Sequence, residues 1–221
     1  MKIDNNVPFY SNTPDDTHCF QAALKMILKY FQSEKDFSWE ELEKMTAKVE
    51  GLWTWATAGV LWMQKNGFDV KNIESFDYHL FIEKGGEYLV EEFGEEMGVA
   101  QIKNSDISQE QKLAKEYLEN IIVKKRVPII NDLKKFLEDG YLIICNVNSQ
   151  ALNQNIGYCG HSIVIKGIED DKLIIHDPGL PPLENRHVSF DVFESAWAYP
   201  NEKAKNIIAF KLKNNKNVQQ H

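Results

Sequence analysis

The sequence of 221 residues lacks any apolar run that approaches the roughly 20 residues of a membrane-spanning helix. Its first residues, from Met1 to Pro8, contain no apolar segment of the kind that a secretory signal requires. The usual sequence features of membrane and secreted proteins are therefore missing. We expect a cytoplasmic protein that does not insert into a membrane.

Cysteine is also scarce. The chain contains three cysteines, Cys19, Cys145 and Cys159. A small and odd number argues against the disulfide framework that stabilises many secreted domains. The fold must then depend on a hydrophobic core, and a chain of this length is long enough to bury one.

Positive charge is in short supply as well. The chain has 25 Lys and Arg residues against 33 Asp and Glu residues, which gives a formal net charge of -8. An acidic protein repels phosphate groups, so we do not expect nucleic acid as a partner. The one basic cluster, Lys124-Lys125-Arg126, is interpreted as the solvated end of a helix. The remaining composition, with 43% hydrophobic and 26% charged residues, is typical of a folded globular protein.

Helical patterns dominate the first half of the chain, and strand patterns dominate the second. Apolar residues at helical spacing follow Asp15-Asp16-Thr17, which predicts a helix capped by one of these residues, with Cys19 in its first turn. This order predicts an α+β fold in which a helical amino-terminal half packs on an antiparallel sheet. Further helices are expected in four places: after Ser38, over residues 54–66, over most of 78–126, and over 131–138. Strands are expected over residues 68–74, 141–147, 161–167, 172–176 and 206–212.

Three residues stand where chemistry is plausible. Cys19 lies at a helix start, where the helix dipole favours a thiolate. His161 opens an apolar strand, and Asp177 ends the next strand of the expected hairpin, so the carboxylate would lie near the imidazole and orient it. Each residue alone also fits a structural role, as a small buried cysteine, a hydrogen-bonded core histidine or a turn aspartate before Pro178.

Taken together, three short segments resemble the bacteriocin-processing, double-glycine-type cysteine peptidases and their broader papain-like relatives. Residues 7–12 are similar to the opening stretch of that family, residues 18–31 to its nucleophile helix, and residues 160–178 to its histidine–aspartate hairpin. The resemblance implies one papain-like domain over residues 1–212. Residues 33–140, which match nothing assigned, are expected to be a helical elaboration that covers part of the cleft, and residues 213–221 a disordered tail.

The resemblance also assigns roles to single residues. It implies that Cys19 is the nucleophile, that His161 moves the proton, and that Asp177 orients His161. The oxyanion would be bound by the Cys19 backbone amide and by Asn12, which stands where the family has a glutamine and is one methylene shorter. The residues that flank these positions are expected to contact the substrate: His18, Gly160 and Pro178.

Two departures from the family pattern concern the surroundings of the thiol. Phe20 stands where the family favours glycine, and it is expected to crowd the approach to Cys19. His18 replaces the usual aspartate.

Three tryptophans lie at near-helical spacing: Trp53, Trp55 and Trp62. They are expected to belong to the core rather than to form a surface that binds a ligand.

The function that these residues favour is a cysteine peptidase or related thiol hydrolase that acts on a peptide or small amide substrate, without a cofactor or metal. A papain-like acyltransferase and a non-catalytic binding domain on the same fold remain alternatives. A zinc site is a further alternative, because one stretch pairs His18 with Cys19 and another places Cys159 and His161 on one strand face. The sequence gives no indication of the oligomeric state.

Overall fold

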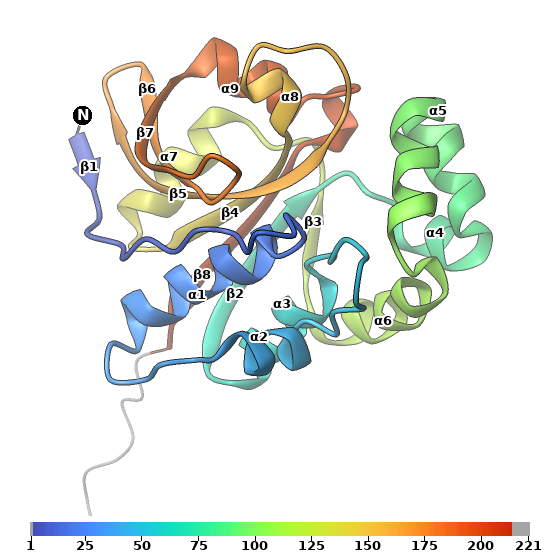
Figure 1. Ribbon diagram of the computed structural model, residues 1–221, viewed down its shortest axis with the longest axis horizontal. Helices are drawn as coiled ribbons and strands as arrows, with labels where there is room; N and C mark the ends of the chain where they lie inside the picture. Colours follow the sequence, from blue (N-terminus) through green and yellow to red (C-terminus); the bar gives the residue numbers. More distant parts are fainter. Residues whose placement is uncertain (1, 214–221) are drawn as a thin grey trace, which may run out of the picture.

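The computed structural model describes residues 2–213 of the protein and confirms the expected α+β fold (Figure 1). Residues 214–221, most of the predicted disordered tail, lie outside the described residues. The strands are β1 (Lys2–Asp4), β2 (Phe68–Glu74), β3 (Val123–Lys125), β4 (Leu142–Asn148), β5 (Gly160–Glu169), β6 (Lys172–Asp177), β7 (Leu183–Ser189) and β8 (Asn206–Leu212). They form one sheet in the order β3-β2-β8-β4-β5-β6-β7, with β1 paired to β5. The pairing is antiparallel throughout except between β2 and β3, which are parallel.

The helices are concentrated in the first two thirds of the chain. They are α1 (Cys19–Phe31), α2 (Trp39–Met45), α3 (Thr57–Lys65), α4 (Tyr78–Lys84), α5 (Gly86–Asn104), α6 (Ile107–Asn120), α7 (Ile130–Glu138), α8 (Ser149–Leu152), α9 (Phe190–Trp197) and the 3-10 turn η1 (Glu202–Ala204). Helix α5 is interrupted at Gly94, whose φ of 83° suits a residue without a Cβ. Within residues 2–213, none of the helices combines the length and apolarity needed to cross a bilayer.

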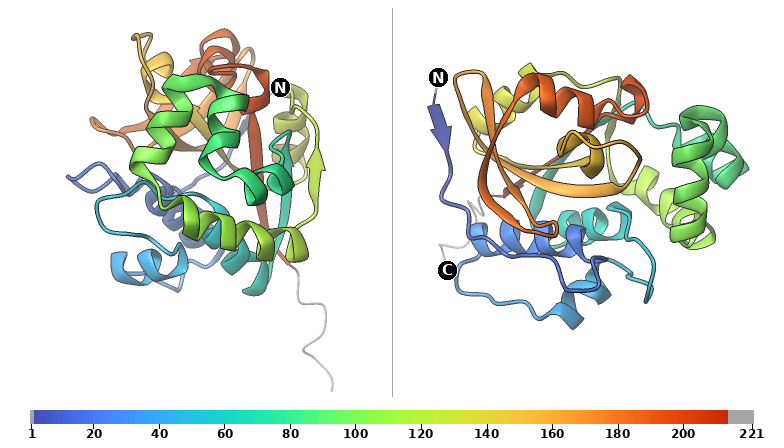
Figure 2. Two further views of the ribbon diagram at one scale, coloured as in Figure 1. Left: turned by 90° about the vertical axis from the view of Figure 1, so that its right-hand side faces the viewer. Right: turned by 45° about the horizontal axis from the view of Figure 1, so that its top comes forward.

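The sheet separates two hydrophobic cores, because successive side chains on a strand point to opposite faces. On one face, Ile144 of β4 packs with α1, α3 and the end of α6. On the other face, Ile143 packs with α7, α8 and α9. A third cluster joins α4, α5 and α6 into a lobe at one edge of the molecule (Figures 1 and 2).

Cys19 lies in the first turn of α1, as predicted, and is its first residue, but the expected cap is wrong. The residue before the helix is His18, and its side chain makes no capping hydrogen bond. Instead, Oδ1 of Asn12 accepts the backbone N–H of His18 at 2.8 Å. A side chain six residues upstream therefore holds the start of the helix, and local capping rules do not anticipate such a partner.

Phe20, in the first turn of α1, is fully buried. A Cβ on Gly59 of α3 would lie 2.7 Å from Cε1 of Phe20, so the ring occupies the space that glycine leaves free. The expected crowding of the thiol is thus reduced, because the ring is directed largely into the core, although Phe20 still contributes to the wall of the cavity described below.

The structure corrects two further expectations and contains elements that the sequence did not predict. Lys124 and Lys125 belong to β3 and not to a helix end, since β3 pairs with Asn72 to Glu74 of β2. Helix α3 begins at Thr57, three residues later than predicted. Strand β7 and helix α9 were not predicted at all. Strand β7 is mostly exposed and polar, so it lacks the apolar alternation that marks a strand in the sequence.

Candidate active site

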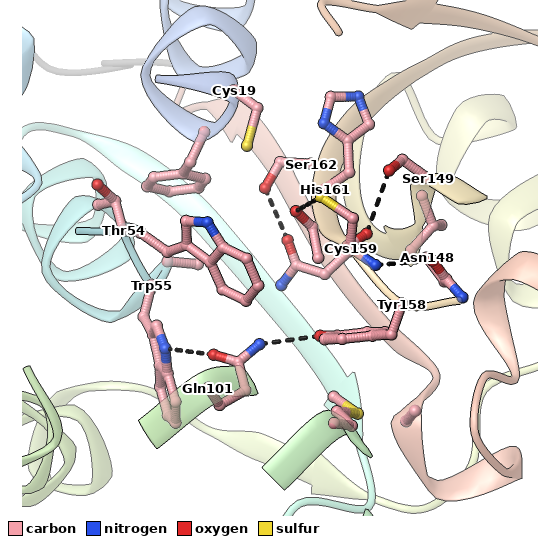
Figure 3. Close-up of a pocket in the computed structure, with 18 of the residues that line it drawn as sticks. Cys19, Thr54, Trp55, Gln101, Asn148, Ser149, Tyr158, Cys159, His161 and Ser162 are labelled. Carbon is pink, nitrogen blue, oxygen red and sulfur yellow. Dashed lines mark hydrogen bonds between the residues drawn. The ribbon is translucent and has the colours of Figure 1, made fainter. Parts of the chain in front are cut away.

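The three residues predicted to act together come from three elements that meet at one end of the sheet. Cys19 is the first residue of α1, His161 lies at the start of β5, and Asp177 ends β6. Nε2 of His161 lies 2.7 Å from Oδ1 of Asp177. The opposite ring nitrogen, Nδ1, is left for the thiol. Figure 3 shows the Cys19 sulfur beside His161 and Ser162.

The Asp177 carboxylate is held from three sides, and both of its oxygens are used. Oδ1 accepts the His161 ring and also the backbone N–H of Gly179 at 3.0 Å. Oδ2 accepts Nη1 of Arg186 in β7 at 2.8 Å. Nη2 of Arg186 donates in turn to the carbonyl of Leu152. The carboxylate is therefore fixed in position before any substrate arrives.

Arg186 was missed by sequence reasoning because β7 was missed. Its neighbours Glu184, Asn185 and His187 are polar and exposed, so the stretch resembles a surface loop. Only the pairing of Ile175 with Arg186 places the guanidinium behind Asp177. The sequence feature that could have drawn attention to Arg186 is that it is an isolated arginine in an acidic chain with little positive charge.

The electrostatics of the site favour an ion pair between the thiol and the imidazole. Burial opposes ionisation of Cys19, but hydrogen bonding and charge from His161, with further hydrogen bonds from Ser162, outweigh it and lower the pKa of the thiol. Burial likewise opposes protonation of His161, but Asp177 and Cys19 outweigh it and raise the pKa of the imidazole. The arrangement thus stabilises a thiolate beside an imidazolium.

Asn12 is placed differently from an amide that points at a reacting carbonyl. Its Nδ2 donates to Oδ1 of Asp16 at 2.7 Å, and its Oδ1 accepts the N–H groups of Thr13 and His18. The side chain is buried and holds the loop before α1. Its role as an oxyanion donor stays a prediction, whereas the first N–H groups of α1 are free of intrahelical partners by geometry.

The flanking residues separate into two groups. Gly160 lines the same cavity as Cys19. Pro178 lies outside it, and its carbonyl accepts the backbone N–H of Asn12 at 2.8 Å. His18 also lies outside it, with Nε2 bonded to Glu43 at 2.8 Å and Nδ1 to Thr13 at 2.7 Å. Gly160 therefore lies in the cavity lining and His18 and Pro178 do not, and substrate contact at the three positions stays a prediction.

The zinc alternative is not supported by this geometry. His18 bonds to Glu43 and lines a neighbouring smaller hollow, outside the lining of the cavity that contains Cys19. Among the residues that the structure describes, no three His, Cys, Asp or Glu side chains form a group able to hold a metal ion. His161 instead uses one ring nitrogen on Asp177.

Cys19, His161 and Asp177 line a cavity of about 790 Å³. Its wall includes Phe93, Met97 and Gln101 of α5, so the segment 33–140 covers part of it, as predicted. A hydrogen-bonded chain closes one side: Nε1 of Trp55 donates to Oε1 of Gln101 at 3.0 Å, and Nε2 of Gln101 donates to the hydroxyl of Tyr158 at 2.9 Å (Figure 3).

The expectation that the tryptophans belong to the core is confirmed for Trp62, wrong for Trp53, and incomplete for Trp55, which packs against the core of the α4–α6 lobe and also faces the cavity. Trp53 and Trp55 line the cavity, whereas Trp62 packs against the core beside α1. Cys159 lines the cavity as well, while Cys145 is fully buried. Helical spacing could not reveal this, because residues 53–55 precede α3 and do not belong to a helix.

Residues 4–205 match the Peptidase C39 like family. The chain belongs to this family. The match includes residues 33–140, so the helical segment that carries no recognisable short motif is part of the C39-like region. No curated protein sequence matches the chain.

Solved structures give the same fold at low sequence identity. The peptidase domain of Streptococcus ComA, a bifunctional ABC transporter, is 16% identical with a TM-score of 0.52, over 94% of this chain and 100% of that one. A double-glycine-motif protease from an AMS/PCAT transporter, in complex with its leader peptide, is 12% identical with a TM-score of 0.50, over 96% and 99%. A C39-like peptidase from Bacillus anthracis is 20% identical with a TM-score of 0.50, over 96% and 98%.

Proposed function

We propose that this C39-like protein is a cysteine peptidase, or a closely related amide hydrolase, with Cys19 as nucleophile, His161 as proton carrier and Asp177 as the residue that orients His161. The observation that carries the proposal is the bond of 2.7 Å between His161 and Asp177, which leaves Nδ1 for a thiol at a helix start. Family membership supports the same reaction class.

The chemistry follows from the ion pair. The Cys19 thiolate attacks the carbonyl carbon of a peptide bond, and the resulting oxyanion is stabilised by N–H groups at the start of α1. The His161 imidazolium gives its proton to the departing amine nitrogen, so the C–N bond breaks and a thioester remains. The neutral imidazole then takes a proton from water, whose oxygen attacks the thioester and releases the acid and the Cys19 thiolate.

A peptide is the substrate class that we propose. One solved C39 protease has been captured with a leader peptide. The cavity of about 790 Å³ in this chain is large enough for several residues of a peptide.

The first test is the alkylation of each cysteine by iodoacetamide across a range of pH, in the parent and in His161→Ala, with assignment by mass spectrometry. Cys19 is expected to react well below the ordinary thiol pKa of about 8.5 in the parent and to lose this reactivity in the variant. Fully buried Cys145 is the internal control and should stay unreactive. If Cys19 reacts identically in both proteins, the proposal fails and a binding domain on this fold is the remaining interpretation.

Activity is then tested with a library of internally quenched peptides, on the parent and Cys19→Ala. Cleavage by the parent alone supports the peptidase. Transfer of the acyl group to an added amine in preference to water would indicate the acyltransferase.

A further inference from the structure

A row of polar residues forms the floor of the cavity and crosses four neighbouring strands. Ser162 of β5 pairs with Asn146 of β4, Asn206 of β8 bonds to the backbone of Asn146, and Asn206 pairs with Glu74 of β2. All four residues line the cavity. Neighbouring strands are about 4.8 Å apart, so the row extends about 14 Å from Ser162, beside Cys19, to Glu74.

This row begins where the apolar core ends. Two residues inward on the same strands, Val164, Ile144 and Ile208 belong to the core that packs against α1. Side chains two apart share a face, so the polar residues occupy that same face. The cavity floor is thus continuous from the thiol to the Glu74 carboxylate.

The end of the cavity at Glu74 is walled by aromatic rings. The ring of Phe76 lies 6.2 Å from Trp55 and 6.2 Å from Phe93, and Tyr78 stacks on Tyr117 at 5.1 Å. These five residues all line the cavity. Aromatic faces carry negative charge density and attract cations.

The charges that face the cavity are mainly negative. The hydroxyl of Tyr78 donates to Oε1 of Glu74 at 2.8 Å, and the Asn72 side chain also interacts with this carboxylate. Near the thiol, Asp15 and Asp16 also line the cavity. Among the described residues, Lys203 is the only Lys or Arg in the lining, and its ammonium is paired with Glu92 at 2.7 Å.

We infer that the end of the cavity at Glu74 binds a cationic group of the substrate, an ammonium or guanidinium, about 14 Å from the reacting thiol. In naming a substrate group, this inference rests on the proposed function. At about 3.3 Å per residue of extended peptide, the cation lies about four residues from the scissile bond, as a basic side chain or the amino terminus. A cation that enters this end of the cavity loses its contacts with water, and the carboxylate and the aromatic rings replace them.

The acidity of Glu74 is consistent with such a site. Burial raises the pKa of the Glu74 carboxyl, and the interactions with the Tyr78 and Asn72 side chains only partly offset this. A bound cation would favour the ionised form, so binding is expected to release a proton in part of the population. This release is measurable as a dependence of the binding heat on the buffer.

Binding is tested without catalysis, in full-length Cys19→Ala. The probe is benzamidinium, an aromatic cation, and its neutral counterpart is benzamide, both titrated by calorimetry. Benzamidinium is expected to bind at least about tenfold more tightly than benzamide, the scale of one charge-assisted hydrogen bond. Glu74→Gln in the same background should remove the preference. The matched control, Glu91→Gln, removes an exposed carboxylate of α5 that pairs with Lys84, and it should leave binding unchanged.

Equal binding of the two probes, or an unchanged preference in Glu74→Gln, overturns the inference, and so does the absence of benzamidinium binding. If Glu74→Gln does not fold, the inference is tested by benzamidinium binding to Phe76→Leu in the same background. It keeps an apolar side chain but removes an aromatic face, so benzamidinium binding should weaken.

The substrate position is tested in the parent with peptides that carry one lysine or norleucine, moved residue by residue. Cleavage should be fastest with lysine about four residues from the cleaved bond, and this preference should vanish in Glu74→Gln. A flat profile, with cleavage intact, overturns the assigned position. If no peptide is cleaved while benzamidinium binds through Glu74, the proposed function fails and the cation site stands.

Discussion

Arg186 and Asp177 form an ion pair of 2.8 Å on the side of the carboxylate opposite to His161. The guanidinium is largely shielded from solvent, and Asp177 is buried. Together with His161 and Gly179, Arg186 keeps the pKa of the Asp177 carboxyl below its usual range even though burial alone raises it. The candidate triad is therefore supported by a fourth side chain that acts through Asp177.

This relationship predicts the effect of Arg186→Gln. Asp177 loses a charged hydrogen bond, worth about 1.5–3 kcal/mol, that fixes its orientation, so it holds the His161 ring in position less firmly. The Cys19 alkylation rate at neutral pH should fall about tenfold, and its pH profile should move to higher pH. The control is Arg126→Gln, which lies in the loop before α7 and loses an ion pair with Asp132 of that helix. If Arg186→Gln loses stability but keeps the pH profile of Cys19 alkylation, Arg186 supports the fold and does not act on the thiol through Asp177.

Glu110 of α6 predicts an unusual pH dependence of stability. It is 5% exposed, its Oε2 has no hydrogen-bond partner among the described residues, and burial raises its pKa to about 7. The unfolded chain ionises this group above about pH 4.5 while the folded protein holds the proton, so stability falls as pH rises from about 4.5 to 7.

The substitution Glu110→Gln removes this titration. The free energy of unfolding should improve relative to the parent by about 2–3 kcal/mol more at pH 8 than at pH 4.5. Urea unfolding at both pH values measures it. Glu116→Gln, at a more exposed position of the same helix, is the matched control and should show little difference between the two conditions.

Gly59 of α3 predicts a steric effect. An added Cβ would lie 2.7 Å from Cε1 of Phe20 and 3.2 Å from Cγ2 of Thr46. Gly59→Ala should therefore destabilise the protein by about 1–3 kcal/mol, as overpacking commonly does. The double variant Gly59→Ala with Phe20→Leu should recover part of this loss, and purely additive urea-unfolding energies would contradict the clash.

The chain from Trp55 through Gln101 to Tyr158 predicts a change in access to the cavity. Gln101→Leu removes the two hydrogen bonds that join α5 to Trp55, in the loop before α3, and to Tyr158, in the loop before His161. Bulky maleimides should then label Cys19 and Cys159 faster than in the parent, whereas the labelling rate with the smaller iodoacetamide should increase less. Equal acceleration of both reagents would point to a change in the thiol itself.

The sequence was sufficient to locate the parts of the site that depend on short-range patterns. The start of α1 at Cys19 and the hairpin that carries His161 and Asp177 follow from apolar periodicity and turn residues. Arg186 was not predictable, because β7 is stabilised by pairing with β6 and not by its own pattern. Trp55 and Glu74 were also missed, since their places in the cavity depend on how α5 and the sheet meet.

On the strand face that packs against α1, inner positions support the core and positions at the strand ends face the cavity. Ile144 supports the core, and Asn146, two residues along, faces the cavity. In β2, Phe68 is core and Glu74 ends the cavity floor. Exchange of a strand-end side chain such as Asn146 or Glu74 therefore alters what the cavity accepts while the inner positions keep their packing. Relatives with this scaffold can diverge in substrate preference through single replacements at the strand tips, without a new fold and with little loss of stability.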